Sequence, residues 1–500
     1  GVSLDNDIVI VGFGVVAVPL TTMTLGGDIS GGALVKVRSG NLVLDGNNSF
    51  TNLLINEGTV TAGSDTAAGA GFIRMLGGTT LAAGVAGVEL ENDIVLSFAE
   101  GGEFAFIDTA GFTFTLNGDI REIDDAGTLS KLGSGNLVLN GDNSFSALDI
   151  TDGTVTLGTN TAGGAGLITM FDETTLAAGE TGLVIQNDIV TQGEGTVNSG
   201  EGVFTLAGDI SGAGSITKIE TGELVLNGDN SFDGLFINSG TVTVGTNTAA
   251  GIGLITMQDG TTLNAGVNAL ALGNNIVITD GEGGGVATVN VDPIVFTLNG
   301  DISGGALTKT GTGNLALNGD NSMSQLNINA GRVTLGTNTA GGAGSIIMAG
   351  GTTLAAGESG LVVGNAITTL GLGTIDSGEG TFTLTGNIGG AGSITKIETG
   401  NLVLNGNNSF DGLFINAGTV TLGTNTAGGA GDITIGSGTT LAAGATIAIA
   451  NDVITLGTGT VDTGAFTLTV NGIVSGDGSL TKIGSGTLSL TQANTYTGGT

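Results

Sequence analysis

Short runs in which apolar and polar residues alternate recur along the whole chain. Val155 and Leu157 alternate with Thr154 and Thr156, and residues 137–140 and 204–206 follow the same pattern. A period of two residues is typical of a β-strand with one buried face. The runs end at glycine, asparagine or aspartate, which favour turns. The pattern therefore predicts many short strands and no long amphipathic helix.

Three sequence blocks return in a fixed order. The first contains a lysine and reads Lys-x-x-x-Gly-Asn-Leu-Val-Leu-Asn-Gly, with variations, and its lysines are Lys36, Lys131, Lys218, Lys309, Lys396 and Lys482. The second reads Asn-Asp-Ile-Val or a variant and starts at Asn6, Asn92, Asn187, Asn274, Asn365 and Asn451. The third, Thr-Asn-Thr-Ala-Gly-Gly-Ala-Gly, starts at Thr159, Thr337 and Thr424, with looser copies at Ser64 and Thr246. Successive lysines are 95, 87, 91, 87 and 86 residues apart, which defines a super-repeat of 86–95 residues.

Such short strands bury a core only when successive coils stack on one another. We therefore expect an all-β fold, a parallel β-helix or β-solenoid with coils of about 22 residues and four coils per super-repeat. One set of coils would be 135–153, 154–173, 174–195 and 196–222. The chain would form a single continuous solenoid over residues 1–500, with about 23 coils and about five and a half super-repeats. Residues 97–111 and 280–293 lengthen two super-repeats, and we expect them to form loops at the side.

Two recurring side chains have predicted structural roles. One large residue occupies the same place in each super-repeat, and we expect it to be a packing plug near a turn: Phe50, Phe145, Phe232, Met323, Phe410 and Tyr496. The recurring lysines lie among glycine and threonine. We expect them to be solvated turn charges, with the alternative that they offset neighbouring acids.

Composition excludes several classes of protein. The chain has no Cys and no His, which removes disulfide frameworks, zinc sites and imidazole catalysis. Its 10 basic and 45 acidic residues give a net charge of −35, which argues against nucleic acid and anionic membranes as partners. The longest apolar stretch, residues 8–20, is too short to span a membrane and lacks the basic flank of a signal peptide.

Residues 478–500 resemble a known family. They read Gly-Ser-Leu-Thr-Lys-Ile-Gly-Ser-Gly-Thr-Leu-Ser-Leu-Thr-Gln-Ala-Asn-Thr-Tyr-Thr-Gly-Gly-Thr, which is similar to the autotransporter-associated β-strand repeat of type V secretion passengers. The core Leu-x-Lys-x-Gly-x-Gly recurs at residues 129–135 and 307–313. The resemblance implies a right-handed parallel β-helix, export through the envelope of a Gram-negative bacterium, and display in the outer membrane or release. It also implies a role as a stalk or adhesin. Separately, we expect no cofactor.

The chain begins and ends within a super-repeat. We therefore expect either a fragment of a longer passenger or a subunit that stacks end to end, and the second case would make it part of an extracellular filament or sheath. A host-surface or carbohydrate ligand is a further possible partner, which the sequence does not identify.

Only acidic residues could support catalysis. Those that recur in every super-repeat fit turns better than a catalytic pair, which should be singular: Asp119, Asp209 and Asp301 at one turn, and Asp142, Asp229 and Asp320 at another. The acids that do not recur are the better candidates for a polysaccharide-degrading enzyme, the second alternative: Glu100, Glu103, Asp108, Asp280, Glu282 and Asp292. We expect no enzyme. The repeats lack the Gly-Gly-x-Gly-x-Asp pattern of calcium-binding β-rolls, so we expect only diffuse Ca²⁺ association with the acidic surface, and no metal site is assigned.

Overall fold

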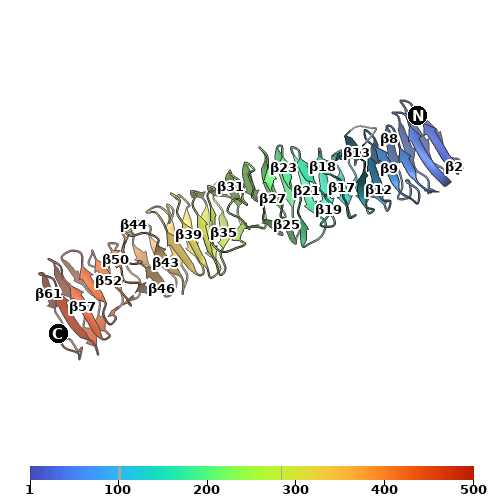
Figure 1. The fold of residues 1–500 in the computed structure, drawn as a ribbon. Helices are drawn as coiled ribbons and strands as arrows, with labels where there is room; N and C mark the ends of the chain where they lie inside the picture. The colour runs from blue at the N-terminus through green and yellow to red at the C-terminus, as the bar shows by residue number, and fades with distance from the viewer. Residues whose placement is uncertain (99–102, 125, 283) are drawn as a thin grey trace. The chain divides into compact units, whose positions relative to one another are not determined.

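The computed structural model describes residues 1–98, 103–124, 126–282 and 284–500. The chain divides into two compact units, Gly1–Gly253 and Leu254–Thr500. Each unit is a parallel β-solenoid in which short strands stack side by side (Figure 1). The prediction of an all-β parallel β-solenoid is confirmed. In the part of the chain that the structure describes, no helix is long and apolar enough to cross a membrane.

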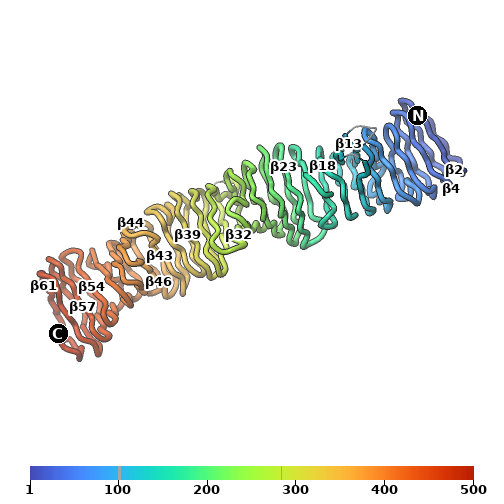
Figure 2. Tube along the Cα trace, viewed as in Figure 1, coloured from blue at the N-terminus to red at the C-terminus, as the bar shows by residue number. Residues whose placement is uncertain are grey.

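Each complete coil has three sides. The strands β13 (Phe104–Asp108), β14 (Thr113–Leu116) and β15 (Ile120–Ile123) follow one another along the chain and belong to three different sheets. The next coil starts with β16 (Thr128–Leu132), which pairs in parallel with β13. The register places Leu129 between Ala105 and Leu148, so the lap that ends at Leu129 is longer than the lap that starts there. The tube in Figure 2 shows successive laps lying side by side within each unit.

One sheet shows the stacking order in the first unit. Its strands, in spatial order, are β1 (Val2–Leu4), β3 (Thr22–Leu25), β5 (Asn41–Leu44), β8 (Thr59–Ala62), β10 (Thr80–Ala83), β13, β16, β18 (Ala147–Ile150), β20 (Leu167–Met170), β23 (Ile189–Thr191) and β26 (Ile210–Ser211). Spatial order equals chain order, because each lap adds one strand to the growing edge of the sheet.

The second unit is built in the same way. One of its sheets contains β33 (Leu270–Leu272), β36 (Val295–Leu298), β39 (Asn314–Leu317), β41 (Arg332–Leu335), β43 (Thr353–Ala356), β46 (Gly373–Asp376), β49 (Ile394–Ile397), β51 (Leu413–Ile415), β53 (Ile433–Ile435), β56 (Val453–Thr455) and β59 (Val474–Gly476). Its neighbour runs β44 (Leu361–Val363), β47 (Thr381–Leu384), β50 (Asn401–Leu404), β52 (Thr419–Leu422), β54 (Thr440–Ala443), β57 (Thr458–Asp462) and β60 (Ser479–Ile483).

The super-repeat spans four laps and one further side of the coil. Lys131 lies on β16, and four laps along the same sheet lead through β18, β20 and β23 to β26. The following strand, β27 (Ser215–Ile219), belongs to the next sheet and carries Lys218. The step from Lys396 on β49 to Lys482 on β60 follows the same rule. The super-repeat is therefore longer than the four coils expected, and equivalent residues move to the next side at each repeat.

This fractional step corrects the expected coil boundaries. Thr175, Thr196 and Thr217 occupy equivalent register positions, so the lap that starts at Thr196 closes at residue 216 and not at 222. Residues 217–222 belong to the next lap. The boundary was misplaced because a super-repeat was assumed to contain a whole number of coils.

The two longer super-repeats also differ from expectation. Within residues 97–111, Phe104–Asp108 forms β13, and within residues 280–293, Val286–Asn290 forms β35. Both are regular ladder strands and not loops. Leu81 pairs with Ile107 and Thr262 pairs with Thr288, so the extra length precedes these strands, after Ser97 and after Thr279. The alternation of apolar residues in Phe104–Asp108 was the signal for a strand.

Apolar columns fill the interior of each unit. Leu137, Val155, Leu176 and Val197 stack in successive laps on β17 (Asn136–Leu139), β19 (Thr154–Leu157), β21 (Thr174–Ala178) and β24 (Glu194–Asn198), and all four are fully buried. Buried apolar area of this kind is the main stabilising contribution to such a fold. Thr154, Thr156, Thr175 and Thr196 on the same strands face outward and are partly exposed.

The predicted packing plugs are confirmed at five positions. The fully buried members are Phe50, Phe145, Phe232, Met323 and Phe410, whereas Tyr496 is half-buried. The ring of Phe145 lies against Gly164, where a Cβ atom would overlap the ring. Gly164 also has a positive φ of 79°, so glycine is required there for two reasons.

Candidate functional site

The recurring lysines are buried ammonium sites. Lys36, Lys131, Lys218, Lys309 and Lys396 have no exposed surface, while Lys482 is half-buried. The expectation that they are solvated turn charges is wrong for these five. The alternation of side chains along a strand explains why these lysines are buried. On β16, Leu129 and Lys131 point to the same side, toward the core, and Lys131 stacks in one column with Ile150 and Met170 of the next laps. That alternation was visible in the sequence and outweighs the general rarity of buried lysine.

Each buried ammonium binds carbonyl oxygens of two successive laps. Lys131 Nζ donates to the carbonyl oxygens of Leu132 at 3.2 Å and Asp152 at 2.7 Å, and also to that of Gly133. Lys218 Nζ donates in the same way to Ile219, Glu220 and Ser239 at 2.8, 2.5 and 3.1 Å. An ammonium has three donor hydrogens, so both groups are saturated. Lys36, Lys309 and Lys396 repeat the pattern.

The carbonyl groups need these donors because the chain turns sharply here. The residue two positions after each of these lysines has a positive φ, and it is Arg38, Gly133, Glu220, Gly311 or Glu398. The acceptor in the next lap directly precedes a glycine with positive φ, such as Gly153 after Asp152. Left-handed residues interrupt the regular ladder, and carbonyl groups buried at such a break must find another donor. The lysine supplies it from inside the coil.

Burial changes the acid–base behaviour of these lysines. Desolvation lowers the pKa of Lys131, Lys218, Lys309 and Lys396 to about 8, and it lowers that of Lys36 as well. Nearby carboxylates, such as Asp152 and Asp108 beside Lys131, act in the opposite direction. The dominant effect is the cost of removing an ammonium from water, which the carbonyl hydrogen bonds offset in part.

Asparagine ladders tie further laps together. The Oδ1 atom of Asn143 accepts from the Ile120 amide at 2.7 Å, and its Nδ2 donates to the Ala162 carbonyl oxygen at 2.8 Å. The side chain therefore links three successive laps and is almost fully buried. Asn48, Asn230, Asn321 and Asn408 make the same pair of bonds.

The recurring aspartates form ladders on the outer surface. Asp188 Oδ1 accepts from the Asp209 amide at 3.0 Å, and Asp209 Oδ1 accepts from the Asp229 amide at 2.7 Å. Asp119 and Asp142 are joined in the same way, as are Asp301 and Asp320. These carboxylates act as turn residues that hold the next lap, as expected from their recurrence.

Three of the acids that do not recur are also engaged locally. Asp108 and Asp280 accept from backbone amides of their own turns, and Asp292 accepts from the amide and hydroxyl of Thr312, which lowers the pKa of Asp292. Glu103 is exposed, and the backbone amide of Glu282 donates to the carboxylate of Asp280. Glu100 lies outside the described residues. Among the described residues, no three Asp or Glu side chains gather closely enough to hold a metal ion.

A groove recurs on the surface, and sequence reasoning did not predict it. It lies between the end of the glycine-rich block and the Asn-Asp-Ile-Val block of the following lap. The Phe72 groove has a volume of about 370 Å³, and it is lined by Asn52, Ala70, Gly71, Phe72, Glu91, Asn92, Asp93 and Arg121. The Leu167 groove, of about 210 Å³, is lined by Ala165, Gly166, Leu167, Gln186, Asn187 and Asp188. The Ser345 groove in the second unit, of about 490 Å³, is lined by residues that include Asn338, Gly344, Ser345 and Asn365.

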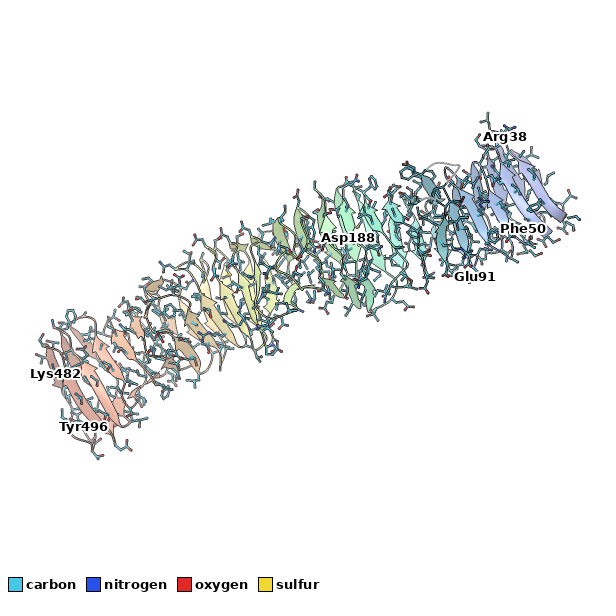
Figure 3. All side chains as sticks on the ribbon, viewed as in Figure 1. Arg38, Phe50, Glu91, Asp188, Lys482 and Tyr496 are labelled. Carbon is cyan, nitrogen blue, oxygen red and sulfur yellow. The ribbon has the colours of Figure 1, made fainter. Side chains whose placement is uncertain are left out.

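The frame of these grooves is the same each time. In the Leu167 groove, Asn187 Nδ2 donates to the carbonyl oxygens of Gly164 at 3.1 Å and Gly166 at 2.5 Å. A Cβ atom on Gly166 would overlap the carbonyl oxygen of Ser146 in the previous lap. Figure 3 labels Glu91 and Asp188, which are exposed residues of two of the grooves. A constant backbone frame thus presents side chains that differ from groove to groove.

Comparison with known proteins identifies the repeat. A family model described as the passenger-associated-transport-repeat matches residues 34–62, 129–157, 216–244, 307–335, 394–422 and 480–500. Each matched segment contains one of the recurring lysines. The resemblance of the lysine block to the repeats of autotransporter passengers is thereby confirmed.

One curated relative is an adhesin. The chain is 32% identical over 133 residues to the adhesin BmaC autotransporter of Brucella suis biovar 1 (strain 1330). The aligned part is 26% of this chain and 4% of the adhesin. No solved structure matches the chain. The chain is therefore a parallel β-solenoid that carries six segments similar to the passenger-associated transport repeat.

Proposed function

We propose that this chain is the spacer of a surface-displayed or secreted adhesive protein. The observation that carries the proposal is the buried lysine that staples two successive laps at the left-handed turn of each super-repeat. Together with the parallel ladders, it gives every lap bonds to the next, which is how a solenoid resists bending and stretching. The acidic exterior keeps neighbouring molecules apart at short range.

The sequence similarity supports the same role. Passenger repeats belong to proteins that are exported and displayed or released, and the chain is distantly similar to an adhesin. The recurring aspartates and Asp280 are bound to turns, an arrangement that suits a structural part better than an enzyme. Adhesion is the second function that this similarity favours, because the name of the relative assigns adhesion to that protein.

Internal deletions in the native gene test the spacer role. Joining Ser130 to Lys218 removes residues 131–217, and joining Ser130 to Lys309 removes residues 131–308. Both joints connect equivalent positions, so the coil should continue in register. We expect intact cells to display both shortened proteins, detected with an antibody against the remaining repeats, and their adhesion to host cells to fall stepwise with length.

Two results would contradict the spacer role. Adhesion that is independent of length would mean that reach does not matter. Complete loss of adhesion in the shorter deletion, with display retained, would place an adhesive site within residues 131–217. A purified chain whose sedimentation rises steeply with concentration would instead support the alternative of end-to-end assembly.

A further inference from the structure

We propose that the Phe72 groove binds a hexose unit of an uncharged glycan. This inference rests on the proposed adhesive role and adds a ligand class and a position to it. Its volume of about 370 Å³ falls within the range of about 300 to 1,000 Å³ that small-molecule sites occupy. All its lining residues belong to the first unit.

The groove has an apolar wall of the kind that sugars stack on. Phe72 lies at the edge of a lap, directly before the core residue Ile73, yet 39% of its surface is exposed. Its amide is fixed by Asn52 Oδ1 at 3.2 Å, so the residue is held at the edge of the groove. An aromatic face that remains exposed on a rigid frame is available to the C–H groups of a pyranose ring.

Carboxylate and guanidinium groups line the groove beside this aromatic wall and can form hydrogen bonds. Asp93 Oδ1 accepts from the Asp119 amide at 3.1 Å, and Glu91 Oε1 accepts from Asn117 Nδ2 at 2.6 Å. Each bond orients a carboxylate and uses one of its two oxygens, and a carboxylate can accept about four hydrogen bonds. The exposed guanidinium of Arg121, on β15, adds donors from the next lap. Neighbouring hydroxyl groups of a hexose match such a mixture of acceptors and donors.

The charges favour a neutral sugar over an acidic one. Glu91, Asp93 and Arg121 together carry a formal charge of −1, and the whole chain carries −35. A uronic acid or sialic acid would therefore meet net repulsion in the groove. The same repulsion makes a nucleotide or another phosphate ester unsuitable.

The Leu167 groove supplies matched substitutions that the fold already tolerates. At equivalent positions it has Leu167 for Phe72, Gln186 for Glu91 and, one lap on, Ser211 for Arg121. It keeps the glycine and asparagine frame but lacks the aromatic wall and the guanidinium. The differences therefore separate ligand recognition from folding.

The experiment measures sugar binding to the purified chain. Linear trimers of glucose, galactose and mannose are titrated by calorimetry and saturation-transfer NMR, with the galacturonic acid trimer as the charged comparator. We expect at least one neutral trimer to bind with a dissociation constant in the millimolar range, about −4 kcal/mol. Phe72→Leu and Arg121→Ser should each weaken binding at least tenfold, whereas Leu167→Ala should leave it unchanged.

The proposal is overturned by three results. The first is that no neutral trimer binds at about 10 mM. The second is that Phe72→Leu and Arg121→Ser bind the trimer as tightly as the unmodified chain does. The third is that the galacturonic acid trimer binds more tightly than the neutral trimers. Circular dichroism and melting curves of the same variants verify that they are folded. Failure here would leave the spacer role intact, because the deletion series measures display and reach without reference to this groove.

Discussion

The ammonium of Lys131 lies 2.7 Å from the carbonyl oxygen of Asp152, a residue of the following lap. The same ammonium binds the carbonyl oxygens of Leu132 and Gly133 in its own turn. One side chain thus satisfies the polar groups of two stacked turns from within the core. This arrangement occurs at five of the six recurring lysines, and it makes the lysine block a structural element with definite consequences.

Replacing the buried ammonium should destabilise the coil locally. In Lys131→Met the apolar length is kept, but the Asp152 carbonyl group loses its donor, whereas Thr109 still donates to the carbonyl oxygens of Leu132 and Gly133. A buried unsatisfied group costs about 1–3 kcal/mol, and the relief of ammonium desolvation offsets part of this, so we expect a net loss of about 1 kcal/mol. Hydrogen exchange of the amides around residues 132–135 and 152–154 should accelerate, and the melting temperature should fall.

Lys482→Met is the matched control, because Lys482 belongs to the same motif but is only half-buried. Its exchange and melting should be close to those of the unmodified chain. A Lys131→Met protein as stable as this control would show that the ammonium contributes nothing beyond its alkyl chain.

Stability should rise with pH above about 8. The folded pKa of Lys131, Lys218, Lys309 and Lys396 is about 8, below the unfolded value of 10.5. Between these values the unfolded chain binds more protons than the folded chain, so the free energy of unfolding increases with pH over that window. Below pH 8 both states are protonated and this contribution is constant.

Denaturant titrations at pH 7.5, 8.5, 9.5 and 10.5 in high salt measure this effect, since salt screens the growing negative charge. A variant with all four lysines changed to methionine should lose most of the pH dependence, and the part that remains should come from Lys36, whose pKa burial also lowers. A free energy of unfolding that falls over this window in the unmodified chain would contradict the lowered pKa values.

Much of the fold follows from residue parity and spacing. The alternation Thr154-Val155-Thr156-Leu157 predicted both a strand and its buried face, and Val155 and Leu157 are fully buried. The same rule applied to Leu129 and Lys131 would have predicted a buried lysine. The general cost of burying a charge argued against that prediction. The sequence could not show that carbonyl groups at the turn offset this cost.

Other features depend on how laps lie over one another. The extra third of a coil could not be read from the length of the super-repeat, because lap lengths vary, as in the short lap from Asn41 to Thr59 and the long lap from Leu81 to Ile107. These lengths are fixed by turns whose size no single motif reveals. The Phe72 groove arises where two sequence blocks from successive laps meet, so neither block predicts it alone.

The contact between Phe145 and Gly164 should appear as a coupling energy. Gly164→Ala adds a methyl group against the ring and places alanine at a φ of 79°, which should cost about 3 kcal/mol. Phe145→Ala should cost about 3–5 kcal/mol through cavity formation. In the double variant the added methyl group no longer meets the ring, so we expect the two costs to fall short of additivity by about 2 kcal/mol.

Equilibrium unfolding of the four proteins completes this cycle. Phe145→Met serves as a control, because Met323 packs against Gly342 at the equivalent position and should be tolerated with a loss below about 1.5 kcal/mol. Strict additivity of the two alanine substitutions would mean that the ring and the glycine do not constrain each other.

The outer aspartate ladder should oppose folding at low ionic strength. Asp188, Asp209 and Asp229 stack in successive laps, which are about 4.8 Å apart, and like charges at that distance repel by about 1 kcal/mol in water. The bond that each carboxylate makes to the next amide is available to an asparagine oxygen, as Asn387 shows by accepting from the Asn407 amide at 2.9 Å. Asp209→Asn should therefore stabilise the first unit by about 1 kcal/mol at about 10 mM salt and by much less at about 1 M, where the Debye length is near 3 Å.

Asp209→Ala separates charge from hydrogen bonding, since it removes the repulsion and also the acceptor for the Asp229 amide. The prediction would be contradicted if Asp209→Asn lowered the free energy of unfolding at low salt and Asp209→Ala lowered it by no more. The negative charge of the carboxylate would then stabilise the lap, and an asparagine could not replace an aspartate in the ladder.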